Sequence, residues 1–304
     1  MTTVIGLILE LVMLVIFPPA IPGTTPVGAA TIQELPAVPK QPSVMRRSET
    51  PAPAVSARAA GVWDPVTERF LHEKSIDTVV PIASITKLMT VLVALDAKMD
   101  PERTVTITSD DNDPEGSRLP IPNGGVVTVR DLFAATLIAS ANNATEALVR
   151  ATGDEEAAFV EAMNNRASEL GMSSTRFTDV TGLGSHNESS VQDLVVLASE
   201  VFSRPLITEL TTTKTYDVVD QSSGKHLTLT NTNKLVGSDL RIVGGKTGYT
   251  DAAAGALITR VRGIGEHELV IIVLESDGRE QRFSDLRILA DWAFAAYTWP
   301  EAPE

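Results

Sequence analysis

Apolar residues recur at helical spacing through the middle of the chain, and this pattern predicts a run of helices. The expected helices span residues 84 to about 98, 129–138, 144–152, 155–170 and 191–202. Gly171 fits the C-terminal cap of the fourth helix, and Pro205 is expected to stop the fifth. Residues 109–125, between the first two helices, are polar and contain Pro and Gly, so we expect a loop there.

Strand-like patterns flank this helical region on both sides. Residues 60–63 and 69–73 predict a β-hairpin around a turn at 64–68, and residues 104–108 alternate like a short strand. Further strand-like runs follow late in the chain, at 226–230, 254–260 and 268–274, before a closing amphipathic helix at 282–297. This order predicts an α+β fold: an antiparallel sheet built from both ends of the chain, flanked by helices, with an inserted all-helical subdomain.

The first 58 residues differ in composition from the rest. Residues 4–17 are apolar except for Glu10, two prolines follow, and small residues stand at 27–30. We therefore interpret 1–30 as a signal peptide or an N-terminal anchor that attaches the protein to a membrane through residues 1–20, although no Lys or Arg precedes the apolar run. Residues 31–58 predict a Pro/Ala-rich linker, 59–298 a catalytic domain and 299–304 a tail. This organisation predicts an extracytoplasmic protein, either periplasmic or secreted.

Composition and charge exclude several classes of function. The 304 residues include no cysteine, which excludes a thiol nucleophile, disulfides and cysteine metal sites. The formal net charge of −14, without a basic patch, argues against a nucleic-acid partner. The histidines are scattered singly and lack the spacing of metal ligands, so we expect no metal and no cofactor: His72, His186, His226 and His267.

The first candidate for chemistry is Ser84-Ile-Thr-Lys87, which follows Pro81 and opens an apolar helix. A spacing of three residues places both side chains on one helix face, with about 5–6 Å between their Cβ atoms. A serine hydroxyl needs an adjacent base to act as a nucleophile, and a lysine amine held neutral can be that base. The alternative is chance, because roughly one such match is expected in a chain of this length.

Two more polar triplets stand in unusual surroundings. Ser140-Ala-Asn142 interrupts two apolar helices, where it could relay protons and hold a substrate amide, or could simply cap a helix. Lys246-Thr-Gly248 follows two glycines at a predicted strand edge, where it offers a cation and a hydroxyl to an anionic ligand, or could be an ordinary strand entry. A phosphate-binding loop of the Walker A type would need Gly at position 240, which is Leu240.

Taken together and in this order, the three triplets form the signature set of penicillin-recognising serine acyl enzymes. Over residues 59–298 the chain resembles the low-molecular-mass penicillin-binding proteins, the serine D-alanyl-D-alanine carboxypeptidases. Further stretches share this resemblance: Pro81-Ile-Ala-Ser-Ile-Thr-Lys-Leu-Met-Thr90, Thr181-Gly-Leu183, Asn231-Thr-Asn233, Gly244-Gly-Lys-Thr-Gly-Tyr-Thr250 and Ala254-Gly255. The implied fold is that of the β-lactamases and transpeptidases.

The resemblance implies a role for each matching residue. Ser84 would be the acylated nucleophile, Lys87 its general base, and Ser140 the proton relay to the leaving group. Asn142 would hold the substrate amide and Lys87. On the binding side, the terminal carboxylate of a peptide ending in D-Ala-D-Ala would lie against the Lys246-Thr247-Gly248 segment, and the N–H groups of Ser84 and Tyr249 would form the oxyanion hole. β-Lactams would act as inhibitors. Alanine in the middle of the second triplet and Asn143, where an acidic residue is common, are small departures.

The implied function is a serine-type D-Ala-D-Ala carboxypeptidase that acts on peptidoglycan stem peptides. Three alternatives stay open: a D,D-endopeptidase of the same family, a serine β-lactamase and a non-catalytic envelope binder. Residues 177–184 lack the Glu-x-x-Leu-Asn pattern that would favour a class A β-lactamase. We expect no second β-rich domain after the closing helix, and in this respect the chain resembles the short endopeptidase branch of the family.

Overall fold

The computed structural model describes residues 44–48, 50–111, 115–263 and 265–299. The predicted signal or anchor segment, the first part of the predicted linker and most of the predicted tail lie outside these residues. Within them, no helix is both long enough and apolar enough to cross a membrane.

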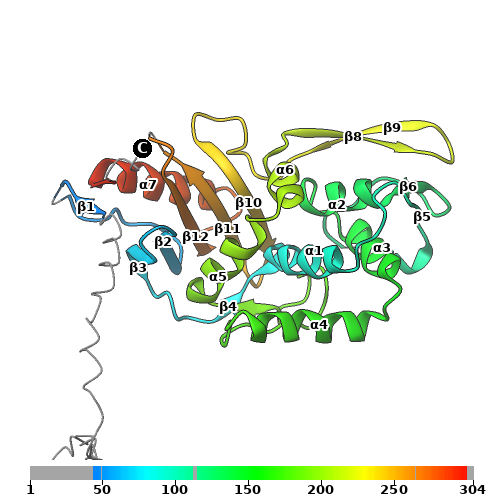
Figure 1. Ribbon diagram of the computed structural model, residues 1–304, viewed down its shortest axis with the longest axis horizontal. Helices are drawn as coiled ribbons and strands as arrows, with labels where there is room; N and C mark the ends of the chain where they lie inside the picture. Colours follow the sequence, from blue (N-terminus) through cyan, green and yellow to red (C-terminus); the bar gives the residue numbers. More distant parts are fainter. Residues whose placement is uncertain (1–43, 49, 112–114, 264, 300–304) are drawn as a thin grey trace, which may run out of the picture. The chain divides into compact units, whose positions relative to one another are not determined.

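A five-stranded antiparallel sheet forms the centre of the domain, with the strand order β10-β11-β12-β2-β3. Its strands come from both ends of the chain: β2 Ala59–Asp64, β3 Arg69–Lys74, β10 Arg241–Thr250, β11 Ala254–Arg262 and β12 Glu268–Ser276. Figure 1 shows the early blue strands beside the late brown ones. The predicted antiparallel sheet from both chain ends is confirmed.

Both faces of the sheet are buried, because side chains alternate between two hydrophobic cores. On β12, Ile271 and Val273 pack on the side of α7 Gln281–Ala296, whereas Val270 and Ile272 pack on the opposite side. That opposite side is covered by α5 Val191–Val201. The strand therefore reads as a continuous apolar run, as expected for a strand buried on both faces.

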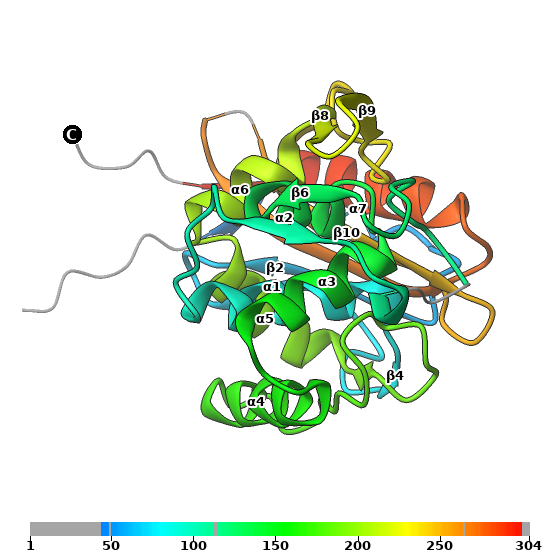
Figure 2. The same ribbon diagram turned by 90° about the vertical axis from the view of Figure 1, so that its right-hand side faces the viewer.

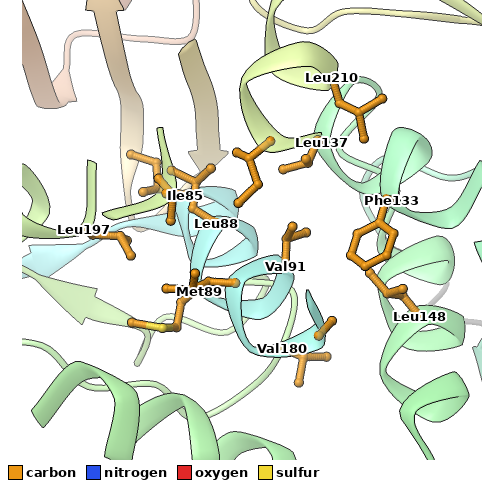
Figure 3. Close-up of a cluster of buried hydrophobic side chains, with 14 of the residues drawn as sticks. Ile85, Leu88, Met89, Val91, Phe133, Leu137, Leu148, Val180, Leu197 and Leu210 are labelled. Atoms are coloured by element: carbon orange, nitrogen blue, oxygen red, sulfur yellow. The ribbon is translucent and has the colours of Figure 1, made fainter. Parts of the chain in front are cut away.

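The inserted region between β3 and β10 is mainly helical and is organised around α1. This helix is buried nearly all round, which is why its sequence is apolar on every face. Figure 3 shows side chains of α1 in one apolar cluster with Phe133 and Leu137 of α2, Leu148 of α3, Leu197 of α5 and Leu210 of α6. The helices of this region span α1 Lys87–Asp96, α2 Val129–Leu137, α3 Asn142–Thr152, α4 Glu156–Glu169 and α6 Pro205–Thr212.

Two elements of this region differ from the prediction. Pro205, which was expected only to stop a helix, begins α6, because proline is tolerated in the first turn where its missing N–H is not needed. The predicted strand at 226–230 lies outside the central sheet, in a separate hairpin of β8 Thr215–Asp220 and β9 Lys225–Thr230. Figure 2 shows this hairpin at the top of the domain and α4 at the bottom.

Short elements complete the domain. Three two-stranded ladders pair β1 Met45–Arg46 with β13 Tyr297–Thr298, β4 Val80–Pro81 with β7 Glu188–Ser189, and β5 Thr104–Thr106 with β6 Val126–Thr128. Two 3₁₀ turns are present, η1 Ala83–Thr86 and η2 Ser109–Asp111.

The segment before β2 packs against α7. Val55 and Ala57 are buried, and Asp285 of α7 accepts hydrogen bonds from the backbone and hydroxyl of Ser56 and from the Ala57 N–H. The packed part of the domain thus includes residues before Ala59, the start expected from composition. The physical reason is that two small apolar side chains in a Pro/Ala-rich stretch give no periodic signal, yet they pack in one hydrophobic cluster with side chains of α7.

The buried carboxylate of Asp64 links the end of β2 to the segments just before β12 and just after β13. Asp64, at the end of β2, accepts hydrogen bonds from Thr67 and from Trp299 Nε1, and its Oδ1 lies 3.1 Å from His267 Nε2. Burial raises the pKa of Asp64, but the hydrogen bonds from His267, Trp299, Thr67 and the Val66 N–H outweigh this and lower it to about 2.

We expect Asp64→Asn to lower the free energy of unfolding by about 2 kcal/mol at neutral pH. Because the folded-state pKa is depressed, this stabilisation is complete above the unfolded value near 3.8 and is lost as the pH falls through about 2. Urea unfolding at several pH values between 2 and 7 would measure it. The difference between wild type and variant should shrink toward acid pH, whereas the exposed Asp77→Asn should change little at any pH; a difference independent of pH would contradict the assignment.

Candidate active site

The predicted triplets meet around one cavity of about 360 Å³, between the sheet edge and the helical region. Its lining comes from segments far apart in the sequence: Ser84, Gly116, Ser117, Ser140, Asn142, Gly182, Leu183, Thr232, Thr247, Tyr249, Thr250, Arg279 and Arg282. Lys87 and Lys246 lie buried behind this lining, with 0% and 1% of their surface exposed.

Ser84 is presented by η1, directly before α1. Pro81 precedes it in the short ladder with β7, and the Ile82 N–H donates to the Asn187 carbonyl, so the approach to the turn is fixed. Ala83 has a positive φ of 46°, a conformation that costs an alanine roughly 1–2 kcal/mol. Such strain persists only where surrounding contacts impose it, and it places the Ser84 hydroxyl at the cavity while its neighbours are buried.

Lys87 Nζ sits within hydrogen-bond distance of three oxygens. It lies 3.1 Å from Ser84 Oγ, 2.8 Å from Asn142 Oδ1 and 2.6 Å from the Thr181 carbonyl oxygen. The amide and the carbonyl can only accept hydrogen bonds at these atoms, so a neutral amine that donates to both directs its lone pair at Ser84 Oγ. The geometry can therefore take a proton from the Ser84 hydroxyl.

Ser140 and Asn142 do not cap a helix. The N-cap of α3 is Ala141, which makes no side-chain capping bond. The Asn142 amide nitrogen donates to the Glu115 carbonyl, which directs its oxygen to Lys87. Ser140 is a second strained residue, with φ of 58°, and its Oγ accepts a hydrogen bond from Lys246 Nζ at 2.8 Å. The triplet thus joins the two buried lysines instead of ending a helix.

The Lys246-Thr-Gly248 triplet lies within β10, which is an edge strand of the sheet. Burial, together with the positive charges of Lys87 and Arg282, lowers the pKa of Lys246 well below its usual range. Thr247 exposes its hydroxyl to the cavity and shares a 2.7 Å hydrogen bond with Thr232 Oγ1. A Cβ on Gly248 would lie 2.6 Å from the Ile82 carbonyl, so the glycine lets β10 approach the turn that carries Ser84.

The loop that supplies the Thr181 carbonyl is fixed by two side chains that the sequence analysis did not assign. Asp179 Oδ1 accepts from the Thr181 and Gly182 N–H groups, and Asn187 donates to Thr86 Oγ1 and to the Asp179 carbonyl. Gly182 packs against η1, where a Cβ would lie 2.0 Å from the Ala83 carbonyl oxygen. The loop and the turn are therefore held at one fixed distance.

Asn143, which stands where the family commonly has an acidic residue, fixes the segment that forms the cavity wall at Gly116 and Ser117. Its side chain accepts from the Leu119 N–H and donates to the Leu119 carbonyl, at 2.8 and 3.0 Å. This pairing anchors the segment that brings Gly116 and Ser117 to the cavity.

Two arginines that the sequence analysis missed also line the cavity: Arg279, two residues before α7, and Arg282, in the first turn of α7. Arg282 is buried, donates to the Gly248 carbonyl at 2.6 Å, and leaves its Nε without a partner among the described residues. Burial and the neighbouring Arg279 charge lower the pKa of Arg282 to about 10. Arg279 lies over the Tyr249 ring at 4.5 Å. Both stand in a polar stretch whose pattern gives no sign that the sheet brings it to the site.

The chemistry available to the cavity is nucleophilic and electrostatic. The cavity-lining residues of the described part include no carboxylate, and no group of three His, Cys, Asp or Glu residues that could hold a metal ion occurs in that part. What the cavity offers is a serine beside a lysine amine, plus a second lysine and two arginines that favour an anionic ligand.

Comparison with known proteins gives consistent matches. The family model described as D-alanyl-D-alanine carboxypeptidase matches residues 46–278. The chain is 33% identical over 240 residues to a D-alanyl-D-alanine endopeptidase of Pseudomonas aeruginosa, covering 78% of this chain and 77% of that one. It is 29% identical over 249 residues to a D-alanyl-D-alanine carboxypeptidase of Bacillus subtilis, covering 80% and 64% of the two chains. The cefotaxime-bound penicillin-binding protein D2 of Listeria monocytogenes is structurally similar, with a TM-score of 0.72, 32% identity, and coverage of 81% and 100%.

We expect Gly182→Ala to slow the reaction of Ser84 with benzylpenicillin by about 100-fold, because the added methyl must push the Thr181 carbonyl away from Lys87. Intact-protein mass spectrometry over time would measure the rate. Gly171→Ala is the matched control: its φ of 77° resembles the 78° of Gly182, but a Cβ there meets nothing within 4 Å. Both variants lose backbone freedom, so equal slowing in both would contradict the proposed contact.

Proposed function

The chain belongs to the D-alanyl-D-alanine carboxypeptidase family of peptidases, and from this premise we propose that it hydrolyses D-alanyl bonds in peptidoglycan peptides through an acyl-enzyme on Ser84. The observation that carries the proposal is the position of Lys87 Nζ, 3.1 Å from Ser84 Oγ and held by two acceptors that cannot themselves donate at those atoms. A serine and a base within hydrogen-bond reach are what acyl transfer requires.

In the first half of the reaction, Ser84 Oγ attacks the carbonyl carbon of a D-alanine residue while its proton passes to Lys87 Nζ. The C–N bond then breaks and an ester forms on Ser84. The proton that Lys87 took from Ser84 passes through Ser140 Oγ to the leaving amine, which leaves Lys87 neutral for the second half. Ser140 Oγ is held by a 2.8 Å hydrogen bond from Lys246 Nζ. In the second half, water attacks the ester and gives a proton to Lys87, and Ser84 recovers its hydrogen. The pKa of Lys246 is depressed by burial and by Lys87 and Arg282, so the two buried amines disfavour being protonated together.

Anion-binding groups would position the substrate. We propose that the carboxylate beside the scissile bond lies against the Thr247 hydroxyl and the guanidinium of Arg282, whose Nε is unpartnered in the described part. Lys246 is buried behind this end of the site and donates a hydrogen bond to Ser140 Oγ. The Ser84 and Tyr249 N–H groups are the proposed oxyanion donors, and removing one such donor typically costs 100- to 1000-fold in rate.

The same site should react with β-lactams and release them slowly. The structurally similar Listeria protein is bound to cefotaxime, and we propose that β-lactams bind this chain and acylate Ser84. Class A β-lactamases release the antibiotic rapidly with the help of an additional glutamate that activates water, and no carboxylate is among the described residues that line this cavity. This favours a penicillin-binding peptidase over a β-lactamase.

Between the two peptidase activities, we favour cleavage of cross-links. The sequence motifs resemble those of the carboxypeptidases, with an endopeptidase of the same family as the alternative. The Pseudomonas relative, named an endopeptidase, is more similar to the chain than the Bacillus carboxypeptidase and is matched over more of its length. Terminal D-alanine removal would use the same machinery. We further propose that the protein works outside the cytoplasm, where peptidoglycan is found, with residues 1–30 as its signal or anchor.

The direct test is intact-protein mass spectrometry after incubation with benzylpenicillin. We expect a lasting penicilloyl adduct on the wild type and none on Ser84→Ala, because the hydroxyl is the attacking group. Ser117→Ala is the matched control, since this serine lines the same cavity without being proposed to react. It should keep the adduct.

Other outcomes would reject the proposal. Fast loss of the antibiotic without an adduct would indicate a β-lactamase, and neither adduct nor loss would indicate a non-catalytic binder. Incubation with purified stem peptides then separates the activities: release of free D-alanine from a pentapeptide measures carboxypeptidase action, and conversion of cross-linked dimers to monomers measures endopeptidase action.

A further inference from the structure

We propose that a second cavity, at the Asp64 end of β2, binds the sugar backbone of peptidoglycan through Trp63 and Glu68. The inference rests on the proposed function, because that function names the polymer, but it concerns a separate place in the fold. Three observations carry it: a floor formed by one row of the sheet, polar groups in the lining that lack partners, and the charge of that lining.

The floor of the second cavity is one cross-strand row of the central sheet. Arg260 of β11 lies opposite Val270 of β12, and Val270 lies opposite Trp63 of β2. Residues directly opposite each other on antiparallel strands share one face of the sheet, and all three line the cavity. Its volume is about 520 Å³, within the range of roughly 300–1,000 Å³ that is typical of ligand sites.

Two further segments form the walls. The last turn of α5 supplies Ala198 and Ser199, and Ser203 follows the end of that helix. The turn between β2 and β3 supplies Pro65 and Glu68. Segments distant in the sequence thus enclose a hollow where α5 stops and leaves the end of the sheet uncovered.

The second cavity is separate from the one around Ser84, and the two share no lining residue. Arg260 lies opposite Gly244 of β10, three residues before Thr247, so the row is roughly 10 Å from Thr247 along the strand direction. Both cavities can therefore be occupied together. A sugar bound in the second one holds the enzyme on the polymer and raises the local concentration of stem peptides.

Trp63 offers the apolar surface that a sugar ring needs. Its ring is half-buried and is fixed by an edge contact with Phe70, with 4.8 Å between the centroids. The indole N–H has no hydrogen-bond partner among the residues that the structure describes. A pyranose has one face of C–H groups and a rim of hydroxyl groups, and an indole pairs an apolar face with one donor.

Glu68 and Arg260 supply polar groups around this ring. Glu68 is exposed and makes no hydrogen bond or ion pair within the described part of the chain. Its φ of 50° is the kind of backbone strain that is concentrated at ligand sites. Arg260 donates to the Phe202 carbonyl at 3.3 Å and pairs with Glu268 at 2.5 Å, so its planar group is held in place. A guanidinium has five N–H donors, and those that remain can serve sugar hydroxyls.

The charge of the lining favours the sugar backbone over the stem peptides. Arg260 is neutralised by Glu268, so among the described lining residues the one unpaired charge is the Glu68 carboxylate. Stem peptides carry carboxylates, which this group and the net charge of −14 repel. N-acetylated amino sugars present hydroxyl and acetamido groups without charge, and these can donate to a carboxylate.

The experiment is a calorimetric titration with a tetramer of N-acetylglucosamine, which contains no peptide. We expect the wild type to bind it equally well before and after acylation by benzylpenicillin. Trp63→Phe should weaken binding by about five- to tenfold, because it keeps an aromatic core residue but loses the wider ring and its N–H. Glu68→Gln should weaken binding by about threefold through the loss of a charged acceptor. Neither variant should change the benzylpenicillin acylation rate, which also shows that both are folded.

Two matched variants serve as controls and should bind like the wild type. Trp292→Phe removes an indole that lines a different cavity and donates to the Thr50 carbonyl. Glu73→Gln removes an exposed carboxylate of β3 in the same hairpin, outside the lining of the second cavity.

Several outcomes would overturn the sugar site. They are no binding by the wild type, unchanged binding by Trp63→Phe, and loss of binding on acylation, which would place the sugar in the cavity around Ser84. Binding of a soluble stem peptide in place of the sugar tetramer would also reject it. In each case a penicilloyl adduct on the wild type would leave the peptidase function intact. Sugar binding without any adduct would instead reject the peptidase and keep the sugar site.

Discussion

The burial of two lysine side chains in one polar centre is the constraint on which this structure depends. An isolated buried ammonium costs several kcal/mol of lost hydration, so each amine must find oxygen partners from the protein. Lys87 finds them on η1, on α3 and on the loop at Thr181, whereas Lys246 reaches the same centre from the sheet edge through Ser140. Four separate segments must therefore arrive together before either lysine can be buried.

This requirement explains the strain and the close contacts around the site. Ala83 and Ser140 adopt positive φ values, and Gly182 and Gly248 approach the η1 backbone more closely than any side chain would permit. Each of these features costs free energy, and each lets a backbone segment lie closer to Lys87 or Lys246. Asp179, Asn187 and Asn143 stabilise these approaches by pairing with backbone groups, which makes them positioning residues for a site they do not touch.

Periodicity predicted the elements that bury large continuous faces, such as α1, α5 and β12, because a long apolar pattern is determined locally. The three motifs that meet at the cavity could be predicted because their polar residues stand close together in short stretches of the sequence. The rest depends on tertiary contacts: α6 begins at a proline, β8 is too mixed in pattern to stand out, and Val55 and Ala57 are buried only because side chains of α7 pack against them. Arg279 and Arg282 belong to the site only because the sheet places the start of α7 beside β10.

The sheet topology also bears on how the chain reaches this state. β2 pairs with β12, for example Val62 with Ile271, so strands from the two ends of the domain are neighbours. Folding slows as contacting residues become more distant in sequence, because the intervening loop must close first. The helices around α1 can form from local contacts, but closing the sheet requires β12, and β10 is aligned against η1 only within that sheet. Ser84 and β10 therefore lie side by side only once the sheet has closed, so a chain that lacked β12 would contain the serine without the complete cavity.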